Sequence, residues 1–463
     1  MNSSPNNSTK TRQLAWQIMR AALNAVEPGA AVQRHLRLNN GHLTIGSRHS
    51  TERTYDLDEF DRVFVVGSGK AGAPMAAAVN KILGPRLTDG VVVVKHGHVM
   101  DDPMATGAIE IIEAGHPVPD EAGLQGAGQI ADLLRSTTSR DLVLCLISGG
   151  GSALLISPVA SISLADLQAL TQVLLSCGAT INEINTIRKH ISQLKGGQLA
   201  QLASPSPVTS LILSDVVGDP LEVIASGPTV ADPTIFGDAW SILERYKVVD
   251  EIPASITNHL SAGMRGDIPD TPKASDPIFD GVQNVIVGSN RLAAQAAAKE
   301  AQQLGFDTIL LTTFLEGEAC EVAKAIAGLA KGVVRGETMH ATDRALSQPA
   351  CLVLGGETTV TLHGEGKAGR NQEMALSAAI SLANWEDILI AFLATDGTDG
   401  PTDAAGAFAD GSTIARATHL GLDAEAHLAR NDSYNFFHEL DDLILTGPTN
   451  TNVNDLVLIL AGG

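Results

Sequence analysis

Residues 141–155, with the sequence DLVLCLISGGGSALL, decide the fold of this chain. The stretch begins as a continuous apolar run and ends in Ser148, three glycines and Ser152. An apolar run of this length, closed by glycines, is typical of a strand that is covered on both faces. Glycine lets the main chain approach a ligand closely, and its N–H group can face negative charge. The stretch therefore predicts a buried strand that leads into an anion-binding turn.

Four other segments repeat this pattern of an apolar strand followed by a polar turn that contains glycine. They are residues 63–72, 285–290, 352–359 and 390–400. One such turn by itself is more often a plain tight turn than a binding site. Ligands of open α/β sheets bind outside the carboxyl ends of the strands. The repetition therefore predicts an active site that is assembled at several strand ends.

Composition limits the class of protein. A chain of 463 residues exceeds what one ordinary core holds, so two domains are expected. Its 31 basic and 52 acidic residues give a net charge of −21 at pH 7. We therefore expect no nucleic-acid partner and no membrane partner, because a basic face supplies most of the affinity for either. An anionic substrate would need a positive charge that is placed locally.

The cysteines and the chain start point to a cytosolic protein. Cys145, Cys177, Cys320 and Cys351 are far apart and no C-x-x-C occurs, so we expect reduced thiols rather than a zinc cluster or a disulfide framework. No window of about 18 apolar residues predicts a membrane span. The polar residues 1–10 lack the apolar core of a signal peptide.

Strand and helix signals alternate along the chain, which predicts a mostly parallel, layered α/β architecture. Residues 266–280 are rich in proline and aspartate and are expected to be a linker, with an N-terminal domain at 1–270 and a C-terminal domain at 271–463. Strands are expected at 62–66, 91–94, 109–113 and 208–213 and, beyond the linker, at 284–287, 308–312, 351–354, 388–394, 443–445 and 456–460; helices at 11–26, 121–136, 163–177, 182–202, 291–304, 318–332 and 371–382; and a hairpin at 43–55.

The turn GSGKAG, which contains Gly67, Ser68, Gly69 and Lys70, fits the dinucleotide-binding pattern G-x-G-x-x-G between a strand and a helix. That pattern makes a dehydrogenase an alternative. The acid that should hold the ribose is missing, however, since the next strand ends in a lysine and a histidine. The lysine inside the turn is a fixed cation beside backbone N–H groups. It can stabilise charge on a phosphoryl group or hold a carboxylate.

Other catalytic motifs do not fit the sequence. Both Gly-Lys pairs are followed by alanine, so neither belongs to a P-loop. Ser148 and Ser152 are not in the G-x-S-x-G context of a hydrolase nucleophile. His96 and His98 form an H-x-H pair without an evident third ligand, so no metal role is expected. His116, in the segment GHPVPD, is expected to support its loop or to contact substrate.

Acidic residues follow two of the expected strands. Asp215 and Asp219 come after the strand at 208–213, where they could bind magnesium or accept a proton from a hydroxyl group. Helix capping and turn formation are the alternative for this pair. Asp396, in the sequence DGTDG, could bind magnesium or orient a hydroxyl group, and an ordinary Asp-Gly turn is its alternative.

Arg370 follows the glycine-rich residues 364–369 at an expected helix start. Glycine costs conformational entropy, and a positive side chain opposes the dipole at the start of a helix. An anion at this position would resolve the conflict. We therefore expect Arg370 to contact an anionic ligand.

Taken in order, these motifs resemble one family, the glycerate 2-kinases, which have an N-terminal Rossmann-like domain and a C-terminal MOFRL domain. The resemblance extends from about residue 11 to the end of the chain. Two positions depart from the family pattern, since Ala368 and Asn450 replace glycines, and asparagine tolerates a left-handed backbone better than alanine does. The matching motifs are GSGKAG, GHPVPD, LISGGGSALL, NTIRKHISQLKGGQLA, LSDVVGDPLEVIASGPT, GGETTVTLHGEGKAGRNQEMAL, ATDGTDGPTDAAGA and TGPTNTNVNDL.

The resemblance implies two layered α/β domains, the first Rossmann-like and the second of the MOFRL type, with the active site in the cleft between them. It implies ATP-dependent phosphorylation of D-glycerate to 2-phosphoglycerate with Mg²⁺, and Lys70 and Arg370 facing each other. Asp215 first, and Asp396 second, would orient or deprotonate the 2-hydroxyl group. The implied site residues are Lys70, Arg370 and Asp215 for catalysis; Gly67, Ser68, Gly69, Ser148, Gly149, Gly150, Gly151, Ser152 and Asn290 for ATP or phosphate; Arg188, Glu357, Asn371 and Asp396 for substrate; and Asp215 and Asp219 for metal.

Two other functions stay open at this point. Members of the family are often labelled hydroxypyruvate reductases, so a reductase that uses NAD(P)H is one alternative, and a non-catalytic protein that binds sugar acids is another. The missing ribose acid, together with Lys70 and Arg370, favours the kinase. The implied partner is the small-molecule substrate D-glycerate, and the resemblance is compatible with a homodimer.

Overall fold

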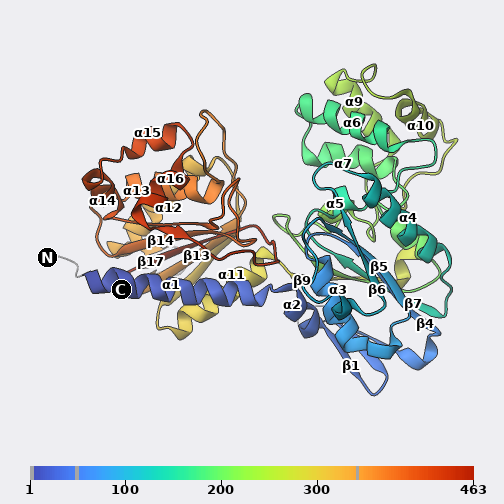
Figure 1. Cartoon of the computed structure of the whole chain (residues 1–463), viewed down its shortest axis with the longest axis horizontal. Coiled ribbons are helices and arrows are strands. Elements are labelled where there is room, and N and C mark those ends of the chain that lie inside the picture. The colour runs from blue at the N-terminus through green and yellow to red at the C-terminus, as the bar shows by residue number, and fades with distance from the viewer. Residues whose placement is uncertain (1–4, 47–51, 340–343, 463) are drawn as a thin grey trace. The chain divides into compact units, whose positions relative to one another are not determined.

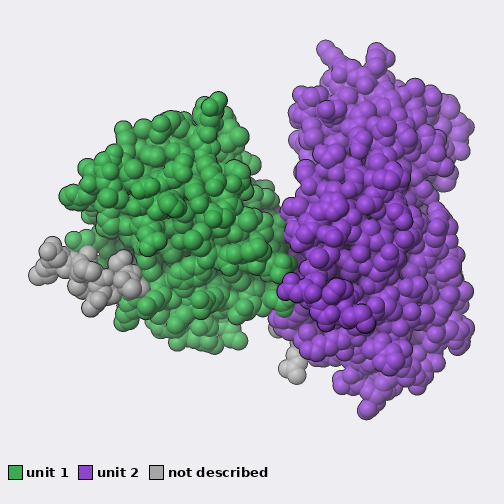
Figure 2. Space-filling view, viewed as in Figure 1, with its two compact units in different colours: residues 1–27, 288–463 green, residues 28–287 purple. Residues whose placement is uncertain are grey.

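The computed structural model describes residues 5–46, 52–339 and 344–462 (Figure 1). The chain forms two units, drawn in Figure 2: unit 1 contains residues 1–27 and 288–463, and unit 2 contains residues 28–287. Within the described ranges, no helix is both long and apolar enough to cross a membrane.

Unit 2 is built on a six-stranded sheet with the order β6-β5-β4-β7-β8-β9. The pairs β6–β5, β5–β4, β4–β7 and β7–β8 are all parallel, which confirms the expected architecture for this unit. Every residue of β7 is buried, as its apolar run predicts for a central strand. The strands are β4 (Arg62–Ser68), β5 (Asp89–Lys95), β6 (Ile109–Ala114), β7 (Asp141–Ile147), β8 (Val208–Leu213) and β9 (Val282–Gly288).

Helices cover this sheet, and four further helices form a layer with its own core. The four helices α6, α7, α9 and α10 pack around buried side chains such as Leu174, Ile187 and Leu243 (Figure 1). The expected cap of α6 is confirmed, because Ser163 and Asp166 form a reciprocal capping box. The helices of unit 2 are α2 (Pro28–His35), α3 (Gly72–Leu83), α4 (Glu121–Arg135), α5 (Gly151–Leu154), α6 (Leu164–Ser176), α7 (Ile181–His190), α8 (Gln198–Ala203), α9 (Phe236–Tyr246) and α10 (Ala254–Met264).

The prediction of a single helix at 182–202 is wrong, because the structure has two helices in this region, α7 and α8. Gly196 and Gly197 lie between them with φ angles of 59° and 82°. The first helix ends at His190, and Gly197 is the N-cap of the second, in a left-handed conformation that glycine adopts without a Cβ penalty. The consecutive glycines in the sequence were the available signal for this break.

Residues 266–280 are not a linker between the units, because they pack inside unit 2. Thr271 is buried, and its hydroxyl donates to Asp232 Oδ2 over 3.0 Å. The strand expected at 284–287 belongs to β9, at the edge of the first sheet rather than in the second. Proline and aspartate therefore marked an irregular segment here, and the division into units differs from the expected boundary at residues 270 and 271.

Unit 1 is built on a mixed six-stranded sheet with the order β10-β13-β17-β14-β15-β16. Only β10–β13 is parallel among the pairs of this sheet whose register the structure describes, and the others are antiparallel. Alternation of helices and strands therefore did not reveal the strand directions. The strands are β10 (Asp307–Leu315), β13 (Ala350–Gly356), β14 (Ile388–Ala394), β15 (Gly406–Asp410), β16 (Leu443–Ile444) and β17 (Asp455–Ala461).

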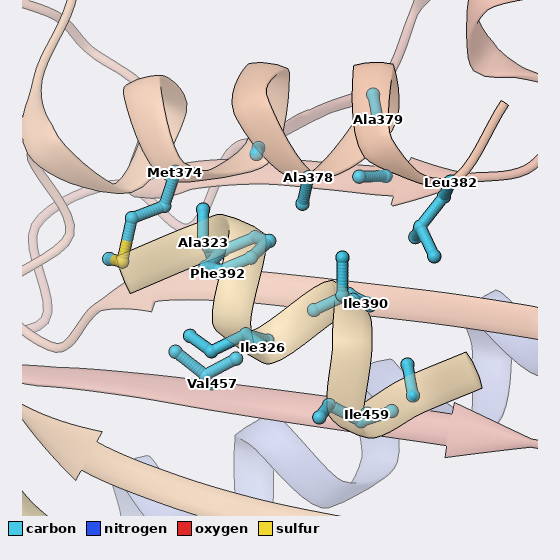
Figure 3. Close-up of a cluster of buried hydrophobic side chains, with 14 of the residues drawn as sticks. Ala323, Ile326, Met374, Ala378, Ala379, Leu382, Ile390, Phe392, Val457 and Ile459 are labelled. Atoms are coloured by element: carbon cyan, nitrogen blue, oxygen red, sulfur yellow. The ribbon is translucent and has the colours of Figure 1, made fainter. Parts of the chain in front are cut away.

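The core of unit 1 lies between this sheet and two helices, α12 and α13 (Figure 3). Alanines such as Ala323 and Ala378 let the helices approach closely, while Phe392 and Ile459 fill the space above the strands. The helices of the unit are α1 (Pro5–Ala25), α11 (Asn290–Gln303), α12 (Ala319–Val334), α13 (Arg370–Ser381), α14 (Thr413–His419), α15 (Ala424–Ala429) and α16 (Ser433–Leu440).

The N-terminal helix α1 belongs to unit 1 although it precedes unit 2 in the sequence. Arg12 on α1 donates to Asp442 Oδ1 over 2.5 Å and to Asp410 Oδ2 over 3.1 Å. The hydroxyl of Thr451 donates to the carbonyl oxygen of Val26 over 2.7 Å. These long-range contacts could not be read from the local sequence.

Smaller elements complete the two units. The expected hairpin at 43–55 is confirmed by the antiparallel pairing of β2 with β3, although its residues 47–51 lie outside the described ranges. Asn450 has a φ of 58°, as expected for an asparagine in place of glycine. The remaining elements are the strands β1 (Leu36–Asn39), β2 (His42–Ile45), β3 (Arg53–Asp56), β11 (Thr338–Met339) and β12 (Arg344–Ala345), and the 3-10 turns η1 (Leu57–Glu59), η2 (Gly84–Arg86), η3 (Pro103–Thr106), η4 (Ile224–Ser226) and η5 (Pro277–Gly281).

Candidate active site

The turns after β4 and β7 in unit 2 pack directly on each other. The backbone N–H of Lys70 donates to the carbonyl oxygen of Gly149 over 2.9 Å, and that of Ala71 donates to Ser148 Oγ over 3.0 Å. A Cβ at Gly69, whose φ is 132°, would lie 2.2 Å from Ser148 Oγ. A Cβ at Gly67 would lie 2.3 Å from a carbonyl oxygen of β7. Close contact with β7 accounts for Gly67, and close contact with the turn after β7 accounts for Gly69.

Three functional side chains converge on the second turn. A Cβ at Gly149 would lie 2.4 Å from Asp215 Oδ2. A Cβ at Gly150, whose φ is 81°, would lie 2.9 Å from His116 Nε2 and 3.6 Å from the Cγ of Lys70. Lys70 from the end of β4, Asp215 from the end of β8 and His116 from the end of β6 therefore surround these two glycines. A side chain at Gly149 would displace Asp215, and one at Gly150 would displace His116.

The electrostatics of this cluster follow from burial and from Lys70. Burial raises the pKa of Asp215, and the raise is opposed by the positive charge of Lys70 and by a hydrogen bond from the backbone N–H of Gly150. Burial, followed by the charges of Lys70 and Lys95, lowers the pKa of His116 to about 4. His116 is therefore neutral at pH 7. A neutral imidazole can both donate and accept a hydrogen bond.

Sequence reasoning did not count His116 among the site residues. Its segment GHPVPD was noted, but a lone histidine in a loop carries little information before its neighbours are known. The turn that it meets is separated from it by more than thirty residues along the chain. The available signal was its position directly after β6, next to β5 in the sheet.

The third glycine of the turn packs against a strained segment. A Cβ at Gly151 would lie 2.8 Å from the Cβ of Ala225. Ala225 and Ser226 have φ angles of 50° and 61°, which are uncommon for residues other than glycine. Ser152 Oγ lies 2.9 Å from Ser226 Oγ. Such backbone strain clusters at functional sites, where the surrounding structure holds it in place.

The expected metal ligands Asp215 and Asp219 both follow β8, four residues apart. In the described ranges, no group of three or more histidine, cysteine, aspartate or glutamate residues could hold a metal ion. Mg²⁺ in phosphoryl-transfer enzymes usually needs only one or two carboxylates besides the substrate phosphates and water. Asp215 fits that requirement as a single ligand. Asp219 lies in the following turn with a φ of 56° and donates its backbone N–H to the carbonyl oxygen of Val216.

Arg188, predicted to bind substrate, lies on α7 of unit 2. It lines a small cavity together with Ser152, which belongs to the glycine turn. Its guanidinium group donates to the hydroxyl of Thr171 over 3.3 Å. Burial lowers the pKa of Arg188.

In unit 1, Arg370 is the first residue of α13 and is held by two acids. Its Nε donates to Asp455 Oδ2 over 2.5 Å, and its Nη1 donates to Glu357 Oε1 over 2.7 Å. Burial alone would lower the pKa of Arg370, but the charges of Asp455 and Glu357 outweigh it and raise the pKa. The anion expected from the helix-dipole conflict is therefore present within the protein. Glu357, predicted as a substrate contact, takes part in this cluster.

Asp399 caps α13 beside this ion pair. Its two carboxylate oxygens accept the backbone N–H groups of Asn371 over 3.1 Å and of Gln372 over 2.8 Å. Burial, followed by the negative charge of Asp455, raises the pKa of Asp399 to about 7. The amide nitrogen of Asn371 donates to Asp399 and to Asp455. Asn371 is thus tied into the acid cluster around Arg370.

The two remaining predicted residues of unit 1 make local contacts. Asp396 Oδ1 accepts the backbone N–H of Thr398 over 3.1 Å, which is the turn contact given above as its alternative. Asn290 donates from its amide nitrogen to the carbonyl oxygens of Val453 and Asp455, both over 2.8 Å. Asn290 therefore fixes the start of β17, the strand that supplies Asp455 to Arg370.

Comparison with known families supports the two-part organisation of the chain. Residues 14–261 match a family described as a domain of unknown function (DUF4147), and residues 350–455 match the MOFRL family. The chain is 41% identical to the glycerate 2-kinase of Pyrococcus horikoshii over 97% of each chain. It is 40% identical to the D-glycerate 2-kinase of Thermotoga maritima over 96% of this chain and 97% of that one.

Another relative, from Agrobacterium vitis, is provisionally named a hydroxypyruvate reductase and is 40% identical over 98% of this chain and 96% of its own. The crystal structure of the glycerate kinase from Thermotoga maritima matches with a TM-score of 0.84 and 39% identity, over 98% of this chain and all of that one. The resemblance deduced from the motifs is confirmed along nearly the full length, and the chain belongs to the glycerate 2-kinase family.

Proposed function

We propose that this protein transfers the γ-phosphoryl group of ATP to the 2-hydroxyl group of D-glycerate and so forms 2-phosphoglycerate. The observation that carries the proposal is the cluster at the carboxyl end of the parallel sheet. There, Lys70 and Asp215 meet at Gly149 and Gly150 in a chain related to named glycerate 2-kinases. A cation, a carboxylate and closely approachable backbone are the parts that phosphoryl transfer needs.

Each part has a task in this reaction. The ATP phosphates lie over the turn 148–152, whose backbone can be approached closely because Gly149 and Gly150 lack side chains. Lys70 stabilises the charge on the transferring phosphoryl group. Asp215, whose pKa is raised by burial, accepts the proton of the substrate hydroxyl as the bond to phosphorus forms.

Arg370 of unit 1 is the third residue that we propose for catalysis. Because Asp455 and Glu357 hold its guanidinium group, Arg370 is oriented before substrate arrives. Asp215 and Asp219 would hold Mg²⁺, which would supply neutralisation of the charge on the ATP phosphates.

The reductase alternative is less well supported. The Gly67 and Gly69 positions are explained by their close contacts with β7 and with the turn that follows it. The strand β5, which should end in the acid that binds a ribose, ends in Lys95.

A product analysis tests the proposal. The full-length protein is incubated with ATP, Mg²⁺ and D-glycerate, and the product is identified by ³¹P and ¹H NMR. We expect 2-phosphoglycerate together with one ADP for each product molecule. A parallel absorbance assay with hydroxypyruvate and NADH or NADPH should show no oxidation of the cofactor. Formation of 3-phosphoglycerate, or oxidation of NAD(P)H without consumption of ATP, contradicts the proposal.

A further inference from the structure

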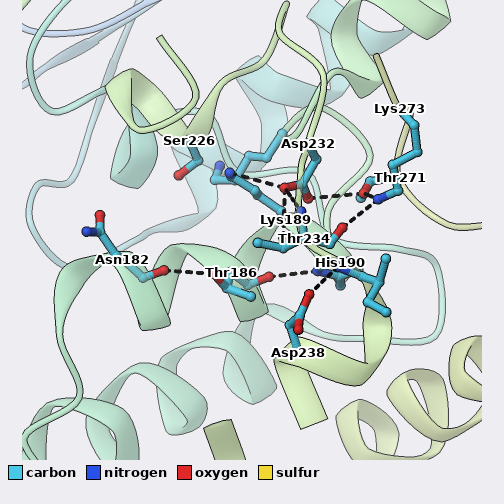
Figure 4. Close-up of polar contacts among 12 residues, drawn as sticks. Asn182, Thr186, Lys189, His190, Ser226, Asp232, Thr234, Asp238, Thr271 and Lys273 are labelled. Carbon is cyan, nitrogen blue, oxygen red and sulfur yellow. Dashed lines mark hydrogen bonds and ion pairs between the residues drawn. The ribbon is translucent and has the colours of Figure 1, made fainter. Parts of the chain in front are cut away.

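Three consecutive basic residues on α7 differ in their partners. Lys189 Nζ lies 3.4 Å from Asp232 Oδ1, within a polar network that includes Thr234 and Thr271 (Figure 4). His190 Nε2 lies 3.1 Å from Asp270 Oδ1. Arg188 pairs with no carboxylate in the described part of the chain.

The side chain of Arg188 is nevertheless partly buried. Burial is what lowers its pKa, and the one hydrogen bond found for its guanidinium group goes to the neutral hydroxyl of Thr171. A guanidinium group has five N–H donors, and taking its charge out of water without an anion is unfavourable. Arg188 is therefore incompletely satisfied, whereas its two neighbours have acids.

Arg188 lines a cavity of about 30 Å³ between α6, α7 and the segment that follows α5. A volume of this kind corresponds to about two or three water-sized positions. It suits the two oxygens of a carboxylate and is too small for a nucleotide base. Ser152, Ser157, Thr171 and Ser192 are the lining residues with hydroxyl groups, and most of the others are apolar. None of the described lining residues is acidic.

A second cation lines the same cavity. Lys195 is 4% exposed, and its ammonium group donates to the carbonyl oxygen of Leu155. Burial, followed by the positive charge of Arg188, lowers the pKa of Lys195 to about 7. The side chains of Arg188 and Lys195 thus line the same small cavity, and no acidic residue in the described ranges lines it with them.

The cavity adjoins the cluster around Lys70. Ser152 on its wall is two residues from Gly150, so their Cα atoms are at most about 7 Å apart. Pro119, also on the wall, follows His116 in the same short loop. The two chain segments that surround the proposed phosphoryl-transfer site therefore also form part of the cavity.

We propose that this cavity binds the carboxylate of the acceptor substrate, with Arg188 as its principal partner, Lys195 as the second cation and the hydroxyls of Ser152 and Thr171 as further donors. The inference rests on the proposed function and adds a selection rule to it. An acceptor must carry a carboxylate next to the hydroxyl that is phosphorylated. In glycerate that hydroxyl is on C2, which would lie at the mouth of the cavity beside Ser152.

Steady-state kinetics with a charged and a neutral acceptor test the inference. D-glycerate is compared with D-glyceramide, which keeps both hydroxyl groups and lacks the charge, in the wild type and in Arg188→Met, Arg188→Lys and the control Arg265→Met. Arg265 is an exposed arginine at the end of α10 that pairs with Asp267. Loss of a charge-assisted hydrogen bond lowers affinity by about 10- to 10²-fold.

We expect Arg188→Met to raise KM for D-glycerate by that factor and to leave KM for ATP within about twofold of the wild type. Its preference for glycerate over glyceramide should largely disappear, and Arg188→Lys should recover part of it. Arg265→Met should behave as the wild type. An unchanged KM for glycerate in Arg188→Met, or a rise in KM for ATP alone, overturns the inference.

Two further measurements separate a role of Arg188 in substrate binding from a role in folding or in turnover. Arg188→Met should melt at or above the wild-type temperature, because it removes a partly buried cation that pairs with no acid in the described ranges. A lower melting temperature together with loss of binding of both substrates would indicate a structural role and overturn the inference. Calorimetric titration of wild type and Arg188→Met with D-glycerate needs no turnover. If the wild type binds glycerate through Arg188 but does not phosphorylate it, the proposed function fails and the carboxylate site stands.

Discussion

The two units differ in how their partly buried positive side chains are paired. In unit 1, Arg370 lies between Asp455 and Glu357, so its charge is neutralised within the protein. In unit 2, Arg188 meets only a threonine hydroxyl, and Lys70 has no ion pair within 4 Å in the portion of the chain that is described. A cation that is already paired is held in one orientation, whereas a cation that lacks an acid gains a partner when an anion binds. Removing the first should mainly affect stability, and removing the second should mainly affect substrate handling.

The largest expected effect is on catalysis, from Lys70→Met. Removing one cation that stabilises transition-state charge should lower kcat by about 10²–10³-fold. The melting temperature should change little, since the variant breaks no ion pair of the described structure. The measurement is kcat in a coupled ADP-release assay, with thermal unfolding recorded on the same sample. Lys81→Met, at an exposed position on α3, is the matched control, and near-normal kcat in Lys70→Met would reject the role.

Arg370→Met should first of all destabilise unit 1. It leaves Asp455, whose side chain is 4% exposed, as a buried acid without its counter-ion. Breaking such a pair by removing one partner typically costs about 3–5 kcal/mol. The measurement is the free energy of unfolding in urea, followed by activity at a temperature at which the variant is folded.

The double variant Arg370→Met/Asp455→Asn separates the two roles of Arg370. Because the remaining partner is now neutral, we expect part of the stability to return. Activity should stay low if the guanidinium group also acts on the transferring phosphate. Full recovery of activity in the double variant would show that Arg370 serves only to balance the charge of Asp455.

The KM for D-glycerate should depend on pH because of Lys195, whereas the acids of unit 1 should not cause such a dependence. Its pKa of about 7 means that the positively charged form is lost as the pH rises through neutrality. Three charged groups lie near Lys195. Arg188 lines the same cavity, and Asp232 and Lys189 form an ion pair next to Gly196, the residue that follows Lys195. KM for D-glycerate should therefore rise several-fold between pH 6 and pH 9. In Lys195→Met the rise should vanish, and a rise of equal size in that variant would assign it to another group.

Local pattern predicted those features of the fold that depend on local sequence. The buried strand β7, the cap of α6 at Ser163 and the glycine turns follow from apolar runs and capping chemistry, which neighbouring residues determine. The edge position of β9 could not be predicted, because the same apolar alternation pairs equally well in either sheet.

The same limit applies to the site. A catalytic role for Lys70 could be proposed from the sequence, because a cation stands inside a glycine turn. The acid that neutralises Arg370 is 85 residues further along the chain, and no local signal connects the two. Because the sequence did not reveal the pairing with Asp455, the arginine at a helix start indicated a contact with a ligand. The meeting of His116 with Gly150 is of the same kind, since only the folded sheet brings the two turns together.

The smallest expected effect is on the stability of unit 1, and it comes from the carboxyl group of Glu373. Burial raises the pKa of Glu373 in unit 1 from 4.5 to about 7, although Asn431 donates a hydrogen bond to it. Folded unit 1 therefore binds this proton more tightly than the unfolded chain does. The stability that it contributes is fully present below pH 4.5 and is lost as the pH rises through about 7.

Glu373→Gln keeps the shape of the side chain and removes the charge. We expect the melting temperature to rise by a few degrees at pH 8, where the wild type must bury an ionised carboxylate, and to change little at pH 5. Glu425→Gln, on the exposed side of α15, is the control and should show no such difference. Calorimetric scans at both pH values measure the effect. A gain at pH 5 as large as that at pH 8 would mean that packing, rather than the proton, limits stability at this position of unit 1.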